Sequence, residues 1–154
     1  MVLTPTQPLP VPPTPQPFSI LVADDDKGNR EALAGLLRDR GFQTVVAADG
    51  GEAVEIIQVT TIHLVLIDMH MPRLTGLEAV QMVRQLNALL PAILMTADAT
   101  RELMRQAFQA QVYSVIPKPV NVNVVLHTLA RALQQVYGPP PAAPATERPD
   151  PPKE

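Results

Sequence analysis

Four short hydrophobic segments of the chain each end in a polar side chain that can bind ions or donate hydrogen bonds. Residues 18–23 end in a cluster of acids and residues 63–67 in a single acid, while residues 92–95 end in a hydroxyl and residues 115–117 in an amine. These groups are, in order, Asp24, Asp25 and Asp26, then Asp68, Thr96 and Lys118. In an open parallel sheet, ligands bind outside the carboxyl ends of the strands, where the strand order reverses. We therefore expect these ends to form one site for a divalent metal and a phosphoryl group.

Segments with helical spacing alternate with the hydrophobic runs. Between residues 29 and 40, for example, Leu33, Leu36 and Leu37 recur at the interval that places them on one helix face. Asp49-Gly50-Gly51 is predicted as a turn. The predicted strands are 18–23, 42–47, 64–68, 92–96 and 113–117, and the predicted helices are 29–40, 52–58, 77–88, 100–110 and 121–137.

This alternation predicts an α/β fold, a doubly wound parallel sheet of five strands with five helices covering both faces. Residues 20–23 and 64–67 are apolar throughout, as expected for central strands that are buried on both sides. Residues 42–45 are more mixed and suit an edge strand. The predicted strand order is 2-1-3-4-5, which is the flavodoxin-like arrangement.

Proline divides the 154-residue chain into a body and two tails. Seven of the 18 prolines fall in residues 1–17, seven more in residues 138–154, and only four between them. Such proline density favours extended or disordered chain. We therefore predict one folded domain over residues 18–137, with disordered tails at 1–17 and 138–154. PxxP spacings such as Pro5–Pro8 offer a docking motif for a partner, but solvated tails are the simpler interpretation.

Composition excludes several classes of protein. The chain has no cysteine, which removes disulfides and thiolate metal sites. Residues 18–137 contain 12 acidic and 10 basic residues without a basic stripe, so nucleic-acid binding is not expected. No segment approaches the roughly 20 apolar residues of a membrane helix, and the N-terminus lacks the features of a secretory signal. We expect a soluble, cytoplasmic protein with no membrane insertion.

The acidic strand ends call for a cation. If Asp24, Asp25 and Asp68 share a small volume, their like charges raise one another's pKa and disfavour the fold locally, and a divalent cation relieves this repulsion. Oxygen-only ligands favour Mg²⁺ or Mn²⁺ over zinc. Thr96 and Lys118 can then hold the oxygens of a phosphoryl group. Asp68 is the best candidate for a nucleophile that forms an aspartyl phosphate, because it stands alone on its strand.

Together, these motifs resemble the receiver domain of two-component response regulators. The resemblance extends over residues 18–137 and rests on four motifs in the expected order. They are Ile-Leu-Val-Ala-Asp24-Asp25-Asp26, Leu-Ile-Asp68-Met-His-Met-Pro72 with Gly76, Leu-Met-Thr96-Ala97, and Lys118-Pro119. No output domain is recognisable after residue 137. The resemblance implies a switch in a phosphorelay that catalyses only its own phosphorylation and dephosphorylation.

The resemblance also implies a metal site and partners. Asp25, Asp68 and the main-chain carbonyl of His70 would ligate Mg²⁺, with Asp24 acting through water. Asp68 would accept the phosphoryl group from a phosphohistidine on a sensor histidine kinase or a histidine phosphotransfer protein. Phosphorylation would then change a surface that a downstream protein target recognises.

On the same resemblance, Thr96 and Lys118 would bind the phosphoryl oxygens, and the Lys118–Pro119 peptide bond would be cis. Two positions depart from the family pattern. Val115 replaces the usual aromatic residue three positions before the lysine, and Tyr113, expected on the same strand face, is a possible substitute. Gln111-Val112 replaces the frequent Gly-Ala pair, so the chain there needs another backbone conformation.

Two other functions stay open at this point. Asp24 and Asp26 form an Asp-x-Asp pair like that of haloacid-dehalogenase-type phosphatases, but no acid follows Lys118 until Glu147. Val115 keeps open a pseudo-receiver that only binds partners.

Several single residues have two interpretations. Asp26 is either a third metal ligand or, preferably, an acid at the start of a helix. Asp98 is expected to cap the helix that follows it. The His70 side chain either influences phosphate lifetime or lies exposed in a loop, while His63 and His127 are expected to be structural or solvent-facing.

Overall fold

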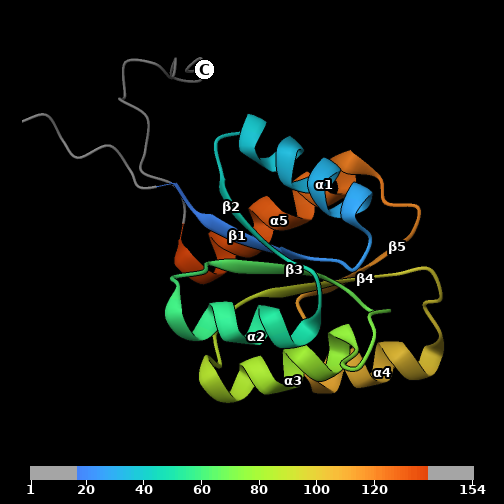
Figure 1. Ribbon diagram of the computed structural model, residues 1–154. Coiled ribbons are helices and arrows are strands. Elements are labelled where there is room, and N and C mark those ends of the chain that lie inside the picture. The colour runs from blue at the N-terminus through green and yellow to red at the C-terminus, as the bar shows by residue number, and fades with distance from the viewer. Residues whose placement is uncertain (1–16, 139–154) are drawn as a thin grey trace, which may run out of the picture.

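The computed structural model describes residues 17–138, in which five strands alternate with five helices (Figure 1). The elements are β1 (Ser19–Ala23), α1 (Lys27–Asp39), β2 (Gln43–Ala47), α2 (Gly50–Val59), β3 (Leu64–Asp68), α3 (Gly76–Leu86), β4 (Ala92–Thr96), α4 (Arg101–Gln109), β5 (Ser114–Pro117) and α5 (Val122–Tyr137). The predicted tails, 1–17 and 138–154, lie almost entirely outside the described residues. Within residues 17–138, none of the helices has the length and hydrophobicity that crossing a membrane requires.

All five strands are parallel and lie in the order β2-β1-β3-β4-β5, which confirms the predicted fold. The strand order reverses between β1 and β3, because the chain builds outward to β2 on one side and to β4 and β5 on the other. The register pairs Ala23 with Ile67, Asp68 with Met95, and Thr96 with Pro117. The carboxyl ends of four strands therefore meet at one edge of the sheet.

Two hydrophobic layers hold the sheet between helices. On one face, Leu21, Val65 and Leu94 pack with α2, α3 and α4. On the other face, Ile20, Leu66, Ile93 and Met95 pack with α1 and α5. Figure 1 shows this division of the helices. Burying each such side chain stabilises the fold by about 1.5–3 kcal/mol before the entropy cost is counted, so the strand positions are fixed on both faces.

The start of α2 corrects one prediction. Residues 49–51 are not a separate turn, since α2 begins at Gly50 and Asp49 is its N-cap. The Asp49 carboxylate accepts the Glu52 N–H at 2.8 Å, and Glu52 Oε1 accepts the Ala48 N–H at 2.7 Å. These reciprocal bonds satisfy amide groups that would otherwise lack partners at a helix start.

Two acids near helix starts have different roles. Asp26 caps α1 as preferred, and its carboxylate accepts the Asn29 N–H at 3.0 Å. Asp98 does not cap α4, and that prediction is wrong. The helix begins at Arg101, so the cap position falls on Thr100, whose hydroxyl accepts the Leu103 N–H at 3.0 Å.

The connection from α4 to β5 adopts an unusual backbone conformation. This was expected, because Gln111-Val112 replaces the frequent Gly-Ala pair there. Gln111 has φ of 60°, a left-handed value that side chains rarely adopt. The Arg84 guanidinium donates to the carbonyl of Gln111 at 2.7 Å and to that of Ala110 at 3.2 Å, and also to that of Leu90. Arg84 therefore ties the end of α3 to this connection.

Tyr113 does not share a face with Val115, so that expectation is wrong. Tyr113 precedes β5 and packs against the layer formed with α1 and α5, whereas Val115 packs against the layer formed with α2, α3 and α4. The two-residue alternation of a strand does not apply to Tyr113, because the residue lies before the strand begins. Tyr113 therefore does not substitute for an aromatic side chain at position 115.

Candidate metal and phosphoryl-acceptor site

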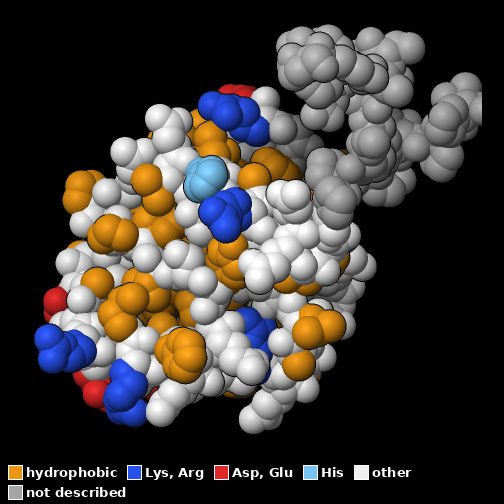
Figure 2. Space-filling view, turned by 180° about the vertical axis from the view of Figure 1, so that it is seen from behind, with side chains coloured by type: hydrophobic (Ala, Val, Ile, Leu, Met, Phe, Trp, Pro, Cys, Tyr) orange, Lys and Arg blue, Asp and Glu red, His pale blue; other side chains and the backbone are white. Residues whose placement is uncertain are grey.

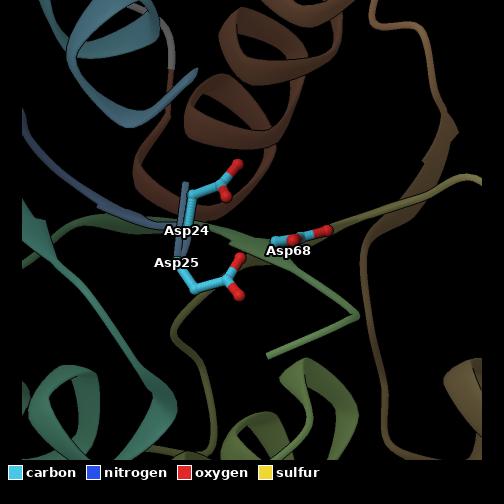
Figure 3. A group of neighbouring side chains, drawn as sticks. All are labelled: Asp24, Asp25 and Asp68. Carbon is cyan, nitrogen blue, oxygen red and sulfur yellow. The ribbon is translucent and has the colours of Figure 1, made fainter. Parts of the chain in front are cut away.

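Three carboxylates meet where the strand order reverses. Asp24 and Asp25 follow β1, and Asp68 is the last residue of β3. One oxygen from each of the three lies within 4.8 Å of the others. Figure 3 shows Asp24 and Asp25 diverging from the end of β1, with both carboxylates on the side where Asp68 lies. Asp24 and Asp68 are each only 3% exposed, while Asp25 is open to solvent.

Lys118 supplies the cation that faces these acids. Its Nζ lies 2.8 Å from Asp68 Oδ1 and 3.9 Å from Asp24 Oδ2. The Lys118 backbone N–H donates to the carbonyl of Thr96 at 2.7 Å, which fixes the residue beside the end of β4. Burial lowers the pKa of the Lys118 ammonium, but its contact with Asp68 and the attraction of the neighbouring acids raise that pKa overall. Lys118 is therefore held in its charged form. The Lys118–Pro119 bond is cis, as expected.

The pKa of the Asp24 carboxyl group is raised by its surroundings. Burial raises the pKa of its carboxyl group, and the Asp26 N–H, which donates to it at 2.9 Å, lowers that pKa again. The negative charge of Asp68 then adds to the increase. The backbone of Asp24 is held by the Arg30 guanidinium, which donates to its carbonyl at 2.7 Å. The residue is thus kept in place although its charge is disfavoured.

The donor set fits Mg²⁺. Among the described residues, the Lys118 ammonium, 2.8 Å from Oδ1, is the one side-chain partner of the buried Asp68 carboxylate. An ionised carboxylate can accept about four hydrogen bonds or metal contacts, so Asp68 has lone pairs left for a further ligand. All the side-chain donors are carboxylate oxygens, which Mg²⁺ and Mn²⁺ prefer. A dication at this position would offset the repulsion among the three carboxylates, which the single Lys118 ammonium neutralises only in part.

Thr96 is the fully buried hydroxyl at the end of β4. Its Oγ1 accepts the Asp98 N–H at 3.1 Å and lies 3.4 Å from Nε2 of His70. His70 itself is exposed in the β3–α3 connection. All the strand-end groups predicted for the site therefore lie at one edge of the sheet, with His70 beside Thr96, whereas Asp26 lies apart from the cluster as a helix cap.

Gly76, which the sequence indicated only as part of the second motif, lies against the backbone of the site. A Cβ atom at this position would lie 2.3 Å from the Asp68 carbonyl oxygen. The Gly76 N–H donates to the Met69 carbonyl at 2.9 Å. The start of α3 thus packs directly on the backbone of Asp68, which only glycine permits. Arg30 was missed, because nothing in its sequence neighbourhood indicates a bond to Asp24.

A cleft opens beside the acids, between α1 and the connection from β5 to α5. Its volume is about 430 Å³, and Asp24 and Lys118 line its polar side. Its remaining wall is mostly apolar and includes Leu33, Leu36 and Val120. Asp24 and Lys118 are therefore reachable from a surface that can also bind apolar groups.

Comparison with known proteins places this geometry in a family. Residues 20–130 match the response regulator receiver domain. The chain is 32% identical over 124 residues to the chemotaxis protein CheY of Pseudomonas aeruginosa, covering 79% of this chain and 100% of that protein. It is 36% identical over 117 residues to the sensor histidine kinase RcsC of Salmonella typhimurium, covering 76% of this chain but only 12% of that protein.

Solved structures agree on the fold. A CheY-like response regulator receiver domain protein from Methanospirillum hungatei superposes with a TM-score of 0.76 at 26% identity, covering 79% of this chain and 97% of that chain. The family match favours the receiver over the haloacid-dehalogenase-type alternative. Asp26, the second acid of the Asp-x-Asp pair, caps α1. The chain thus belongs to the response regulator receiver domain family and has the phosphoryl-accepting function of two-component signal transduction.

Proposed function

We propose that Asp68 is the phosphoryl acceptor and that a divalent cation held by the neighbouring acids is required for the transfer. The observation that carries this assignment is the position of Asp68 inside the cluster. Its carboxylate is buried, lies within 4.8 Å of the Asp24 and Asp25 oxygens, and faces Lys118 at 2.8 Å. No other acid of the described residues combines these contacts.

Each residue has a chemical role in this proposal. A carboxylate oxygen of Asp68 attacks the phosphorus atom, the phosphorus–nitrogen bond of the donor phosphohistidine breaks, and its electron pair remains on the imidazole nitrogen. Lys118 and Thr96 donate to the phosphoryl oxygens, so that negative charge is stabilised as it moves. In this proposal the domain catalyses the phosphorylation and dephosphorylation of its own Asp68.

Asp25, Asp68 and the main-chain carbonyl of His70 would hold Mg²⁺, with Asp24 acting through water. When bound, the ion supplies positive charge that draws the phosphoryl oxygens toward the carboxylates. Mn²⁺ has the same preference for oxygen ligands and should substitute for it.

The proposed partners are proteins. A sensor histidine kinase or a histidine phosphotransfer protein would present its phosphohistidine at the cleft beside Asp24 and Lys118, whose apolar wall suits a protein surface. On the face shown in Figure 2, Lys and Arg side chains are scattered among hydrophobic ones and form no continuous basic stripe. This face therefore carries no basic stripe of the kind that binds nucleic acid, which agrees with a protein as the downstream target.

The assignment is tested by Asp68→Asn. We expect wild-type protein to be labelled by a small phosphodonor such as acetyl phosphate in the presence of Mg²⁺, and labelling to stop when Mg²⁺ is chelated. Asp68→Asn should show no labelling, because the amide cannot form the acylphosphate. Asp39→Asn, which changes an exposed acid at the end of α1, is the matched control and should be labelled normally. Full Mg²⁺-dependent labelling of Asp68→Asn would eliminate the assignment.

A further inference from the structure

The β3–α3 connection places an imidazole against the hydroxyl of Thr96. His70 Nε2 lies 3.4 Å from Thr96 Oγ1, and among the described residues this is the only side-chain contact within hydrogen-bonding distance of that oxygen. Thr96 is fully buried, whereas His70 is exposed. The pair therefore joins the buried site to the protein surface.

A hydroxyl has a single hydrogen to donate. The Asp98 N–H already donates to Thr96 Oγ1 at 3.1 Å, so the oxygen acts as an acceptor on that side. Its hydrogen remains available for an acceptor, and His70 Nε2 is within reach and accepts it in the tautomer that carries the ring hydrogen on Nδ1. At 3.4 Å the two atoms lie farther apart than in a usual hydrogen bond, so the interaction is weak.

A phosphoryl group on Asp68 would compete for the same hydrogen. Asp68 pairs with Met95, the residue before Thr96, and adjacent strands lie about 4.8 Å apart. Anionic phosphoryl oxygens are stronger acceptors than a neutral imidazole nitrogen. Because one hydrogen cannot serve both acceptors, donation to the phosphoryl group ends the bond to His70.

We propose that His70 is a positioning residue that holds the Thr96 hydroxyl hydrogen in the unphosphorylated protein and loses it when Asp68 is phosphorylated. The inference rests on the proposed role of Asp68. Phosphorylation is then reported at the surface through the imidazole in the β3–α3 connection. Val115 on β5 is apolar and packs with the α2–α4 layer, so it offers no competing acceptor.

Nuclear magnetic resonance of the histidine rings tests the resting state independently of phosphorylation. The chain has three histidines, so substitution of each assigns the signals. In the resting protein we expect the His70 tautomer that carries its hydrogen on Nδ1, with the ¹⁵N shift of Nε2 changed by Thr96→Val. Mg²⁺ with beryllium fluoride, which mimics a phosphoryl group on a carboxylate, should produce a similar change. A hydrogen on Nε2 of the resting protein, or a shift that is insensitive to Thr96→Val, would overturn the proposal.

A double-mutant cycle tests the competition itself. His70→Ala should tighten beryllium fluoride binding about threefold to tenfold, because the hydroxyl no longer has an alternative acceptor. The gain should persist with Thr96→Ser, which retains a hydroxyl, and vanish with Thr96→Val. An equal effect of His70→Ala in all three backgrounds, or weaker binding, would contradict the coupling. If the wild type binds no beryllium fluoride, the proposed role of Asp68 is refuted. The His70–Thr96 hydrogen bond is still tested by the ¹⁵N spectrum of the unphosphorylated protein.

Discussion

Ionisable groups have different partners at the two ends of the strands, which we call the amino edge and the carboxyl edge of the sheet. At the amino edge, two ionisable groups have backbone partners: His63 Nδ1 accepts the Ser19 N–H at 2.9 Å, and the Tyr137 hydroxyl donates to the His63 carbonyl at 2.7 Å. At the carboxyl edge, Asp24 and Asp68 face each other and share one ammonium. His63 is half-buried and Tyr137 is exposed, whereas Asp24 and Asp68 are both buried. What distinguishes the carboxyl edge is charge that the protein itself leaves incompletely neutralised.

Two cations make the comparison sharper. Lys118 at the carboxyl edge has carboxylate partners, and its pKa is raised although burial opposes this. Arg84 at the other edge has neutral carbonyl partners, and burial lowers the pKa of its guanidinium. The first cation neutralises a charge that chemistry requires, whereas the second fastens the backbone. Substitutions at the two edges should therefore differ in whether they change the chemistry or only the stability.

The largest effect is expected from Gly76→Ala, which disrupts the carboxyl edge. The new methyl group would lie 2.3 Å from the Asp68 carbonyl oxygen and 2.9 Å from Leu94 Cδ1, so α3 or the end of β3 must shift. We expect a loss of about 3 kcal/mol in the free energy of unfolding, the upper end for overpacking, together with reduced labelling of Asp68. Urea denaturation measures the first effect and phosphodonor labelling the second.

Gly35→Ala is the matched control, because a Cβ atom there meets nothing within 4 Å. Alanine in the interior of α1 should stabilise the protein by about 0.5–1 kcal/mol. If Gly76→Ala behaved like Gly35→Ala, the close approach of α3 to Asp68 would be refuted.

A smaller effect is expected from Arg84→Met at the amino edge. The change removes the guanidinium donors from the carbonyls of Leu90, Ala110 and Gln111. We expect about 2 kcal/mol of lost unfolding free energy, because these bonds are charge-assisted and partly buried. Arg84→Lys should recover only part of this, since an ammonium lacks the planar fork. Normal labelling of Asp68 in both variants is the second expectation, and its loss would show that the two edges are not separable.

The fold could be predicted from the sequence because the burial of each strand is visible in its own run of apolar residues. The runs at β1, β3 and β4 are buried on both faces, so uninterrupted apolar residues indicated central strands. Strand ends then indicated which carboxylates would converge. Gly50 shows where this reasoning failed: the glycine pair looks like a turn, but a Cβ atom at Gly50 would lie 3.1 Å from Leu74. Close packing against a distant residue, rather than local flexibility, explains glycine there.

The parts of the site that were missed depend on side-chain contacts that no sequence pattern indicates. The bond from Arg30 to the Asp24 carbonyl, and the approach of His70 to Thr96, follow from distances that only the folded chain defines. The cap of α4 also depended on where the helix begins, since both Asp98 and Thr100 are good capping residues. Sequence pattern thus identified the chemical groups, while their hydrogen bonds required the structure.

The smallest effect is expected from protonation of His63 at low pH. This change tests whether groups at the amino edge affect only stability and not the chemistry at Asp68. Burial lowers the pKa of His63 below 6.5, so the unfolded chain takes up the proton before the folded one. Stability from the neutral ring is therefore complete above about pH 6.5 and is lost as the pH falls toward the lowered folded value. Protonation of the folded protein also costs a hydrogen bond, because a proton on Nδ1 removes the acceptor of the Ser19 N–H. About 1 kcal/mol is at stake, the usual value of one hydrogen bond.

His63→Asn provides the reference, because its amide oxygen can accept the same N–H but does not titrate. Urea midpoints at about pH 8 and about pH 5 should show wild type losing stability relative to this variant as the solution is acidified. His70 and His127 are present in both proteins, so their titration cancels in the difference. A difference that is constant with pH would mean that His63 keeps its bond when protonated, and the amino edge would then not be held by neutral partners. A loss of Asp68 labelling that parallels the stability difference would instead connect the two edges, since acid at His63 is expected to leave the chemistry at the opposite edge unchanged.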